Sequence, residues 1–384
     1  IPDEVRNRFR QAVDEGGRAQ GDWEALFDGY AEEHPDAAAQ LETLWAGEVP
    51  DGWQTALPAF QPEDGPMATR KASGIVLNAI ADHLPTLVGG SADLAPSNKT
   101  MLDGYDVQQA AAPGGRNLRF GVREHAMAGI LNGIALHGGI LPYGGTFLVF
   151  SDYMRPSIRL AALMELPIVY VWTHDSVWIG EDGPTHQPVE HLPSLRAVPN
   201  LDVIRPADAN ETAVAWREAL ERRDGPTGLV LTRQGLPILD RDELASADGL
   251  ARGAYVISEA PQGAPELIML ASGSEVHLAM EAQELLLDRG VEARVVSMAS
   301  WKRFEDQPES YQHQVLPPDI AARVAVEAAV PLGWERYVGP RGAVVAMEHF
   351  GASAPYHNLK EAFGFTAQAV VEQALKVLER TKRD

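Results

Sequence analysis

The stretch Ile168-Val169-Tyr170-Val171-Trp172 decides the fold class. It is followed at once by the polar turn Thr173-His174-Asp175-Ser176. Five apolar residues without alternation predict a strand that is buried on both faces. A helical pattern at 153–166 precedes this run, and another at 210–222 follows it. Because short apolar runs here alternate with helices, we expect a mainly parallel sheet that helices cover on both sides.

The same alternation of short apolar runs and helical patterns continues on both sides of this stretch along the chain. It predicts an α/β fold with two consecutive open, mainly parallel sheets flanked by helices. We expect a helical linker segment at 1–66 with a break at His34-Pro35, an α/β domain at 67–235, a connector at 236–265 and a smaller α/β domain at 266–384. Among the finer expectations are separate strands at 140–143 and 147–150. Gly273-Ser274-Glu275 is expected to form only a strand-to-helix turn and cap.

Composition excludes several classes of protein. Among 384 residues, 32 are basic and 54 acidic, which gives a net charge of −22. Such a charge argues against binding nucleic acid or an anionic membrane surface, and no apolar stretch approaches the length of a membrane helix. Cysteine is absent, so thiolate sites are excluded. This composition fits a reducing compartment, and we expect a cytoplasmic protein.

The densest polar signal lies at Gly180–His191, in a loop after the decisive strand. Open α/β sheets place ligands at the carboxyl ends of their strands, so this loop is a candidate polar site. A solvated loop is the alternative. We expect no metal site in this chain, because His186 and His191 are five residues apart in a proline-interrupted segment, not four apart on a helix.

Two further segments carry candidate residues. Glu124, in Gly121–His125, stands where a helix begins, and the positive helix end favours its ionised form; a helix cap is the other interpretation. Phe147, Phe150 and Tyr153 recur at three-residue spacing after a glycine pair. They form either part of the core or an aromatic platform for a flat heterocycle.

Cations and turn residues stand in three more places: Arg70-Lys71, Gly89–Asn98 and Thr232-Arg233-Gln234. Each is by itself typical of a surface or a helix cap. In a chain this acidic, however, an anionic substrate needs locally assembled cations of this kind.

Together these segments closely resemble transketolase. The matching strings are Arg70–Ser73, Gly89–Asn98, Gly121–Glu124, Thr173–Ser176, Gly180–Val189 and Asp224–Arg233. The resemblance implies the thiamine diphosphate-binding fold of a pyrimidine-binding domain, followed by a transketolase C-terminal domain. It also implies a missing domain, because no Gly-Asp-Gly motif followed by Asn is present to hold the diphosphate through Mg²⁺ (or Ca²⁺). The chain therefore resembles the C-terminal part of a longer enzyme, or one subunit of a split enzyme.

The resemblance assigns cofactor roles to five residues. Glu124 corresponds to the glutamate that meets N1′ of the aminopyrimidine of thiamine diphosphate, which favours the imino tautomer that takes the thiazolium proton. Phe147 would stack on the pyrimidine, with Phe150 and Tyr153 completing the pocket. Asp93 would lie near the cofactor at the subunit boundary.

Substrate roles follow in the same way. Arg70, Ser97, His174 and Arg233 match residues that hold the sugar phosphate, since two guanidinium groups clamp a dianion well. Asp182 and His186 match residues that contact the sugar hydroxyls, and His186 would assist proton transfer.

The implied reaction is transfer of a two-carbon ketol unit from a ketose phosphate, such as xylulose 5-phosphate, to an aldose phosphate, such as ribose 5-phosphate, in the pentose phosphate pathway. The family places its active sites between two subunits, so we expect a homodimer. Two alternatives stay open. One is a related thiamine diphosphate enzyme, either dihydroxyacetone synthase or a 2-oxoacid dehydrogenase β-type subunit, and the other is a non-catalytic fragment of this fold.

Overall fold

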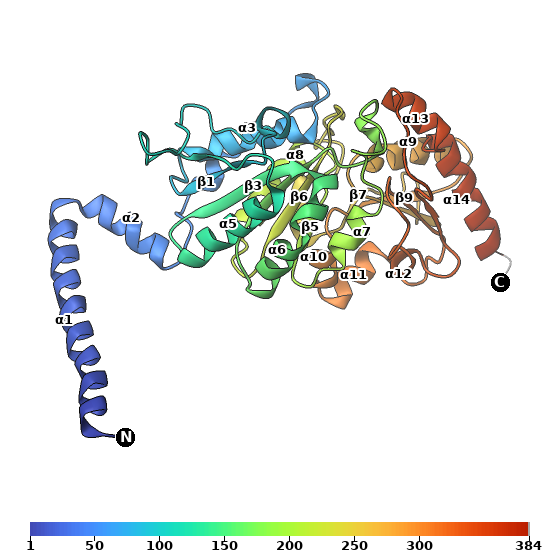
Figure 1. Cartoon of the computed structure of the whole chain (residues 1–384). Helices are drawn as coiled ribbons and strands as arrows, with labels where there is room; N and C mark the ends of the chain where they lie inside the picture. Colours follow the sequence, from blue (N-terminus) through green and yellow to red (C-terminus); the bar gives the residue numbers. More distant parts are fainter. Residues whose placement is uncertain (383–384) are drawn as a thin grey trace. The chain divides into compact units, whose positions relative to one another are not determined.

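The computed structural model describes residues 1–382, which form a small unit at Ile1–Asp51 and a larger unit that begins at Gly52 (Figure 1). Two helices make up the small unit, α1 (Asp3–Glu33) and α2 (Pro35–Trp45). The predicted break at His34-Pro35 is confirmed, since proline at the first helical position loses no intrahelical hydrogen bond. Phe27 of α1 packs against Trp45 of α2, with 5.4 Å between ring centroids.

The first sheet of the larger unit has six parallel strands in the order β2-β1-β3-β4-β6-β5. These strands are β1 (Leu87–Ser91), β2 (Asn117–Arg119), β3 (Leu141–Phe147), β4 (Val169–Thr173), β5 (Asp202–Ile204) and β6 (Thr227–Leu231). The decisive apolar run is β4, which lies between β3 and β6 and is buried along its whole length. That position explains why its residues do not alternate with polar ones.

Helices cover both faces of this first sheet. They are α3 (Thr69–Ala81), α4 (Ala95–Asn98), α5 (Glu124–His137), α6 (Ser151–Leu163), α7 (His191–Arg196) and α8 (Ala209–Glu221). On one face Tyr170 and Trp172 share a core cluster with Met127 of α5 and Ile158 of α6. On the other face Trp216 of α8 donates a hydrogen bond to Ser73 of α3 (2.8 Å).

The second sheet has five strands in the order β11-β10-β8-β9-β7, all parallel except β7. They are β7 (Tyr255–Ser258), β8 (Leu267–Ala271), β9 (Ala293–Ser297), β10 (Arg323–Val326) and β11 (Ala343–Val345). Its helices are α9 (Glu275–Leu287), α10 (Trp301–Glu305), α11 (Glu309–Val315), α12 (Glu335–Val338), α13 (Tyr356–Ala362) and α14 (Ala367–Thr381). The predicted fold class, two consecutive mainly parallel sheets flanked by helices, is confirmed.

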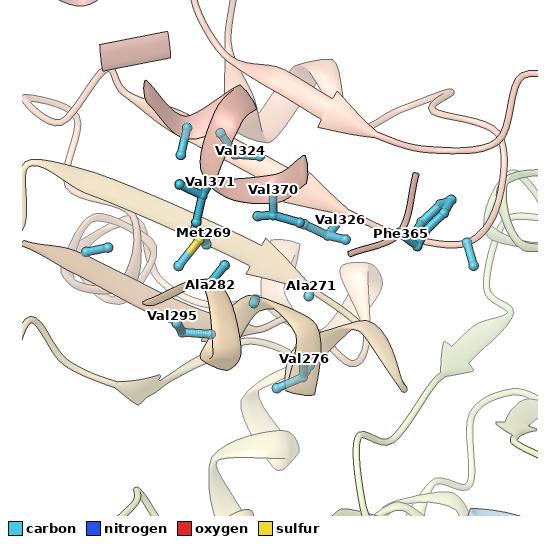
Figure 2. Close-up of a cluster of buried hydrophobic side chains, with 14 of the residues drawn as sticks. Met269, Ala271, Val276, Ala282, Val295, Val324, Val326, Phe365, Val370 and Val371 are labelled. Carbon is cyan, nitrogen blue, oxygen red and sulfur yellow. The ribbon is translucent and has the colours of Figure 1, made fainter. Parts of the chain in front are cut away.

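Successive residues of β8 serve opposite faces of this second sheet. Met269 and Ala271 pack with α9 and α14, where Val276 and Val371 meet them (Figure 2). Ile268 and Leu270 belong to a second cluster on the opposite face, formed with α10 and α12. A strand that is buried on both faces keeps the two-residue period in space although its sequence is apolar throughout.

The structure departs from the sequence predictions in four places. The strand predicted at 147–150 is wrong: β3 runs through the glycine pair to Phe147, and a 3-10 turn, η3 (Leu148–Phe150), follows. Strands β5 and β7 were not predicted, and β7 lies inside the expected connector. The turn at Gly273 is present (φ +56°), but Ser274 makes no side-chain cap, because its hydroxyl donates instead to Glu275 (2.7 Å).

Candidate functional site

The predicted site residues follow the carboxyl ends of the first sheet's strands. Strand β1 is followed by Asp93 and Ser97, and strand β2 by Glu124. Strand β3 ends at Phe147, and Phe150 and Tyr153 come just after it. Strand β4 is followed by His174, Asp182 and His186, and strand β6 by Arg233. Arg70 is the second residue of α3, and the first residue of that helix bonds to the chain just after β6: the Thr69 amide donates to the Thr232 hydroxyl (3.0 Å). Since all six strands are parallel, these segments meet along one edge, where open α/β sheets bind ligands.

A chain of buried hydrogen bonds ties the centre of this edge together. Ser91 at the end of β1 donates to Asn98 (2.9 Å), and the Asn98 amide donates to Thr173 at the end of β4 (2.7 Å). The Thr173 hydroxyl lies 2.8 Å from His174 Nδ1. His174 is buried and adopts a left-handed backbone conformation (φ +59°), which is costly for a residue with a Cβ.

Three positively charged or titratable groups converge on one side of the edge. Arg70 is half-buried and donates to the Ser97 carbonyl (2.7 Å). Burial lowers the pKa of Arg70, and Arg233 lowers it further, whereas Asp182 raises it. Burial lowers the pKa of His174 to about 3, and Arg70, Arg233 and His186 act in the same direction. The repulsion between Arg70 and Arg233 is relieved when an anion binds between them.

The low pKa of His174 predicts a neutral imidazole at working pH. Its folded pKa lies below the ordinary value, so acidification between those two values protonates the unfolded chain first and destabilises the fold. We expect the His174 ring signals in NMR spectra to stay constant from about pH 8 to about pH 5. The His174→Gln variant assigns these signals by their loss, and a titration of His174 near pH 6.5 would contradict this prediction.

Aromatic rings line the edge beside β3. His174 covers one face of Phe147 (centroids 3.5 Å apart, planes at 23°), and Phe150 lies parallel to Phe147 at 5.7 Å. His186 meets Phe150 edge-on at 5.6 Å, and Tyr153 is 65% exposed. Because only 8% of Phe147 is exposed, a flat ligand has to approach this cluster from the side of Phe150. Such a cluster can hold a heteroaromatic ring by stacking.

Glu124 opens α5 on the other side of β1, as predicted. Its carboxylate is half-buried and has no hydrogen-bond or ion-pair partner within residues 1–382. β1 separates β2 from β3, so the ends of the strands that carry Glu124 and Phe147 are roughly 10 Å apart by strand spacing. Asp93 lies between them with a left-handed backbone (φ +61°) and lines a hollow of about 360 Å³ with Arg119 and Gly121.

Three side chains near this edge carry the kinds of atoms that bind metal ions, although the sequence predicts no metal site. Ligand atoms of Asp152, Glu190 and His191 lie within 4.8 Å of one another. His191 Nε2 is already 3.0 Å from Asp152, and Arg155 lies 3.8 Å from the same carboxylate. A neighbouring cation disfavours a divalent ion here, so we assign no metal to this group.

Sequence reasoning missed a buried group of charges behind the site. Arg205 bonds to Asp175 and Glu275, and Arg196 bonds to Glu327. The local sequence predicts only a turn and cap at Glu275, yet this side chain accepts hydrogen bonds from Trp178 (2.8 Å) and from the Ala328 amide (3.1 Å). No local pattern marks these residues, because their partners are far away in the sequence.

Two family profiles match this chain, one over the residues of each sheet. The profile of the family "Transketolase, pyrimidine binding domain" matches residues 65–238, and that of "Transketolase-like TK C-terminal domain" matches residues 253–366. The chain is 53% identical over 379 residues to a transketolase of Geobacillus stearothermophilus and 51% identical over 380 residues to one of Aquifex aeolicus. These alignments cover 98% and 99% of this chain but 57% and 54% of the relatives. The chain thus spans little more than half the length of the curated relatives it matches.

Solved structures give the same picture. A Pichia stipitis transketolase in complex with sedoheptulose 7-phosphate superposes with a TM-score of 0.94 at 41% identity, over 100% of this chain and 56% of that one. A chain described as a split-gene transketolase, an inactive β4 tetramer, superposes with a TM-score of 0.65 at 27% identity, over 82% of this chain and 99% of that one. In the described part of the chain, no helix is both long and apolar enough to cross a membrane.

Proposed function

The chain belongs to the transketolase family, and from this premise we propose that it carries the aminopyrimidine and sugar-phosphate side of a ketol-transferring active site. The reaction is reversible transfer of a two-carbon ketol unit from a ketose phosphate to an aldose phosphate, as in the pentose phosphate pathway. The observation that carries the proposal is the convergence of Glu124, the Phe147 ring cluster and the Arg70–Arg233 pair on one sheet edge.

The residues present fit thiamine diphosphate. The unpartnered, half-buried carboxylate of Glu124 lies on one side of β1, and the Phe147 ring cluster lies on the other. This arrangement suits a pyrimidine ring that stacks on the aromatic cluster and forms a hydrogen bond with the carboxylate. When bound, the cofactor supplies the electron sink for the carbanion that ketol transfer requires. Glu124 then holds a proton at N1′ of the aminopyrimidine, and Phe147 and Phe150 hold the ring. We propose that the diphosphate and its Mg²⁺ bind to a further domain.

The substrate roles rest on charge and position. Arg70 and Arg233 hold the phosphate dianion, and Ser97 and His174 complete this contact. As a neutral imidazole, His174 can donate or accept one hydrogen bond without adding to the local positive charge. Asp182 lies close enough to Arg70 to affect its pKa, and with His186 it contacts the sugar hydroxyls. His186 moves a proton at the substrate oxygen.

We propose that a second subunit completes the site. Helices α5 and α6, which follow β2 and β3, expose four apolar side chains: Ile130, Leu136, Leu160 and Leu163, of which Leu163 is 68% exposed. Exposed apolar surface of this kind is typical of a subunit interface. A homodimer of the complete enzyme brings the diphosphate-binding domain of one subunit to the site edge of the other. The cytoplasmic location expected from composition stays a prediction.

The acceptor distinguishes this function from that of its nearest relatives. With xylulose 5-phosphate as donor, ribose 5-phosphate is expected to react at least about tenfold more efficiently than formaldehyde, because only the sugar phosphate uses the two arginines. The measurement is kcat/KM for each acceptor in the complete enzyme. A preference for formaldehyde would support a dihydroxyacetone synthase, and turnover only of 2-oxoacids that lack a ketol hydroxyl group would support the dehydrogenase subunit.

A further inference from the structure

Five charged side chains form a buried ion cluster between the two sheets: Arg196 and Arg205 with Asp175, Glu275 and Glu327. Asp175, Arg196 and Arg205 belong to segments of the first sheet, whereas Glu275 and Glu327 follow β8 and β10 of the second. Each of these side chains is at most 6% exposed. Charges removed from water so completely require well-placed partners, and this cluster supplies them.

Arg205 is the link between the two sheets. Its Nε and Nη2 atoms donate to one oxygen of Asp175 (2.9 and 2.7 Å). Its Nη1 atom donates to the Ser272 carbonyl (2.9 Å) and to Glu275 of the second sheet. The backbone of Arg205 also accepts from Gly273 (3.1 Å), where a Cβ would come within 2.7 Å of the guanidinium. Position 273 therefore needs glycine for contact as well as for its positive φ.

The cluster ends directly beside a site residue. Asp175 follows His174, whose left-handed backbone and stacking on Phe147 place it at the ligand edge. A strained backbone persists only when its surroundings hold it. On one side the Thr173 hydroxyl contacts the His174 ring, and on the other Arg205 holds Asp175.

The second sheet also contacts the loop that carries Asp182 and His186. The Trp178 indole donates to Glu275, and the Gln187 amide donates to the carbonyls of Gly180 (2.9 Å) and Ala352 (2.9 Å). Ser353 donates to the Glu181 carbonyl (2.6 Å). A Cβ at position 351 would overlap the Gln187 side chain, at 1.8 Å from its oxygen.

We propose that the second sheet is a positioning device for substrate binding: Arg205 and Glu275 fix Asp175 and Trp178, and residues 351–353 fix the following loop. His174, Asp182 and His186 are thereby held in place for the sugar phosphate. This inference rests on the proposed function. It assigns Asp175, Arg205, Glu275 and Ser353 as positioning residues, which act through their neighbours and contact neither substrate nor cofactor.

The test compares two buried carboxylates that both join the sheets. Asp175→Asn weakens the contact beside His174. Asp202→Asn is the matched control. Asp202 is buried and accepts hydrogen bonds from Ser300 and Arg303 of the second sheet's domain. It stands at the amino end of β5, whereas the site lies at the carboxyl ends of the strands. KM and kcat are measured in the complete enzyme with xylulose 5-phosphate and with hydroxypyruvate, a ketol donor without phosphate. Thermal unfolding is followed in parallel.

We expect Asp175→Asn to raise KM for xylulose 5-phosphate about tenfold, with a much smaller change for hydroxypyruvate. Asp202→Asn should lower the melting temperature and leave both KM values unchanged. The proposal is overturned if Asp175→Asn behaves like the control, or if it changes both donors equally.

A second variant covers the case in which Asp175→Asn does not fold. Ser353→Ala removes one hydrogen bond at the surface, and we expect it to raise KM for xylulose 5-phosphate about threefold through the Asp182 loop. An unchanged KM for this variant would overturn the proposal. Lack of ketol transfer by the unaltered enzyme would instead refute the proposed function, so the two failures can be told apart.

Discussion

Glu124→Gln is expected to lower kcat for ketol transfer by about 10²- to 10⁴-fold, because an amide cannot take up the proton that a carboxylate holds at N1′. The carboxylate has no partner among the described residues, so its removal disturbs no internal contact. The melting temperature should therefore stay close to that of the unaltered protein. Steady-state kinetics at saturating thiamine diphosphate give the result directly.

A matched control exists for this prediction. Glu243 is exposed and is not one of the candidate site residues, and Glu243→Gln makes the same chemical change. We expect it to leave kcat unchanged. If Glu124→Gln kept kcat within about threefold of the unaltered enzyme, the assignment of Glu124 to the cofactor would be wrong.

The second large effect concerns the phosphate. Arg70→Gln and Arg233→Gln are each expected to raise KM for xylulose 5-phosphate by about 10- to 100-fold, since each removes a charge-assisted hydrogen bond to a dianion. Hydroxypyruvate carries no phosphate, and its KM should change far less. Arg289→Gln, at an exposed arginine of the second sheet's helical layer, is the control. Equal effects on both donors would show that the two arginines support the fold and do not bind phosphate.

Much of the fold could be predicted from local patterns. Strand β4 and strand β8 are continuous apolar runs, and such runs indicate burial on both faces. Strands β5 and β7 escaped prediction, because three or four residues carry little pattern of their own. Strand β7 alternates between buried and half-buried positions, and only its antiparallel pairing with β9, nearly 40 residues later, makes it a strand.

That most of the candidate residues lie along one edge of the sheet has a topological reason, whereas their roles come from the resemblance and stay predictions. Most of the candidate residues stand just after a strand of the first sheet, and parallel strands bring those positions to one edge. Arg70, in the first turn of α3, is an exception. The structure adds contacts that no local motif contains. His174 stacks on Phe147 from the neighbouring strand, and Arg205 joins Asp175 to Glu275 across 100 residues of sequence. Buried polar contacts of this kind depend on tertiary packing, so the local sequence around Glu275 indicates only a turn.

The central claim is that this chain supplies the aminopyrimidine and sugar-phosphate side of a shared site. The most direct test measures ketol transfer from xylulose 5-phosphate to ribose 5-phosphate by the chain alone and after mixing with a diphosphate-binding domain from a longer relative. Thiamine diphosphate and Mg²⁺ are present throughout. We predict that activity appears only in the mixture and is lost with Glu124→Gln. Activity of the chain alone, or a mixture that binds the cofactor without transferring ketol units, would contradict the account.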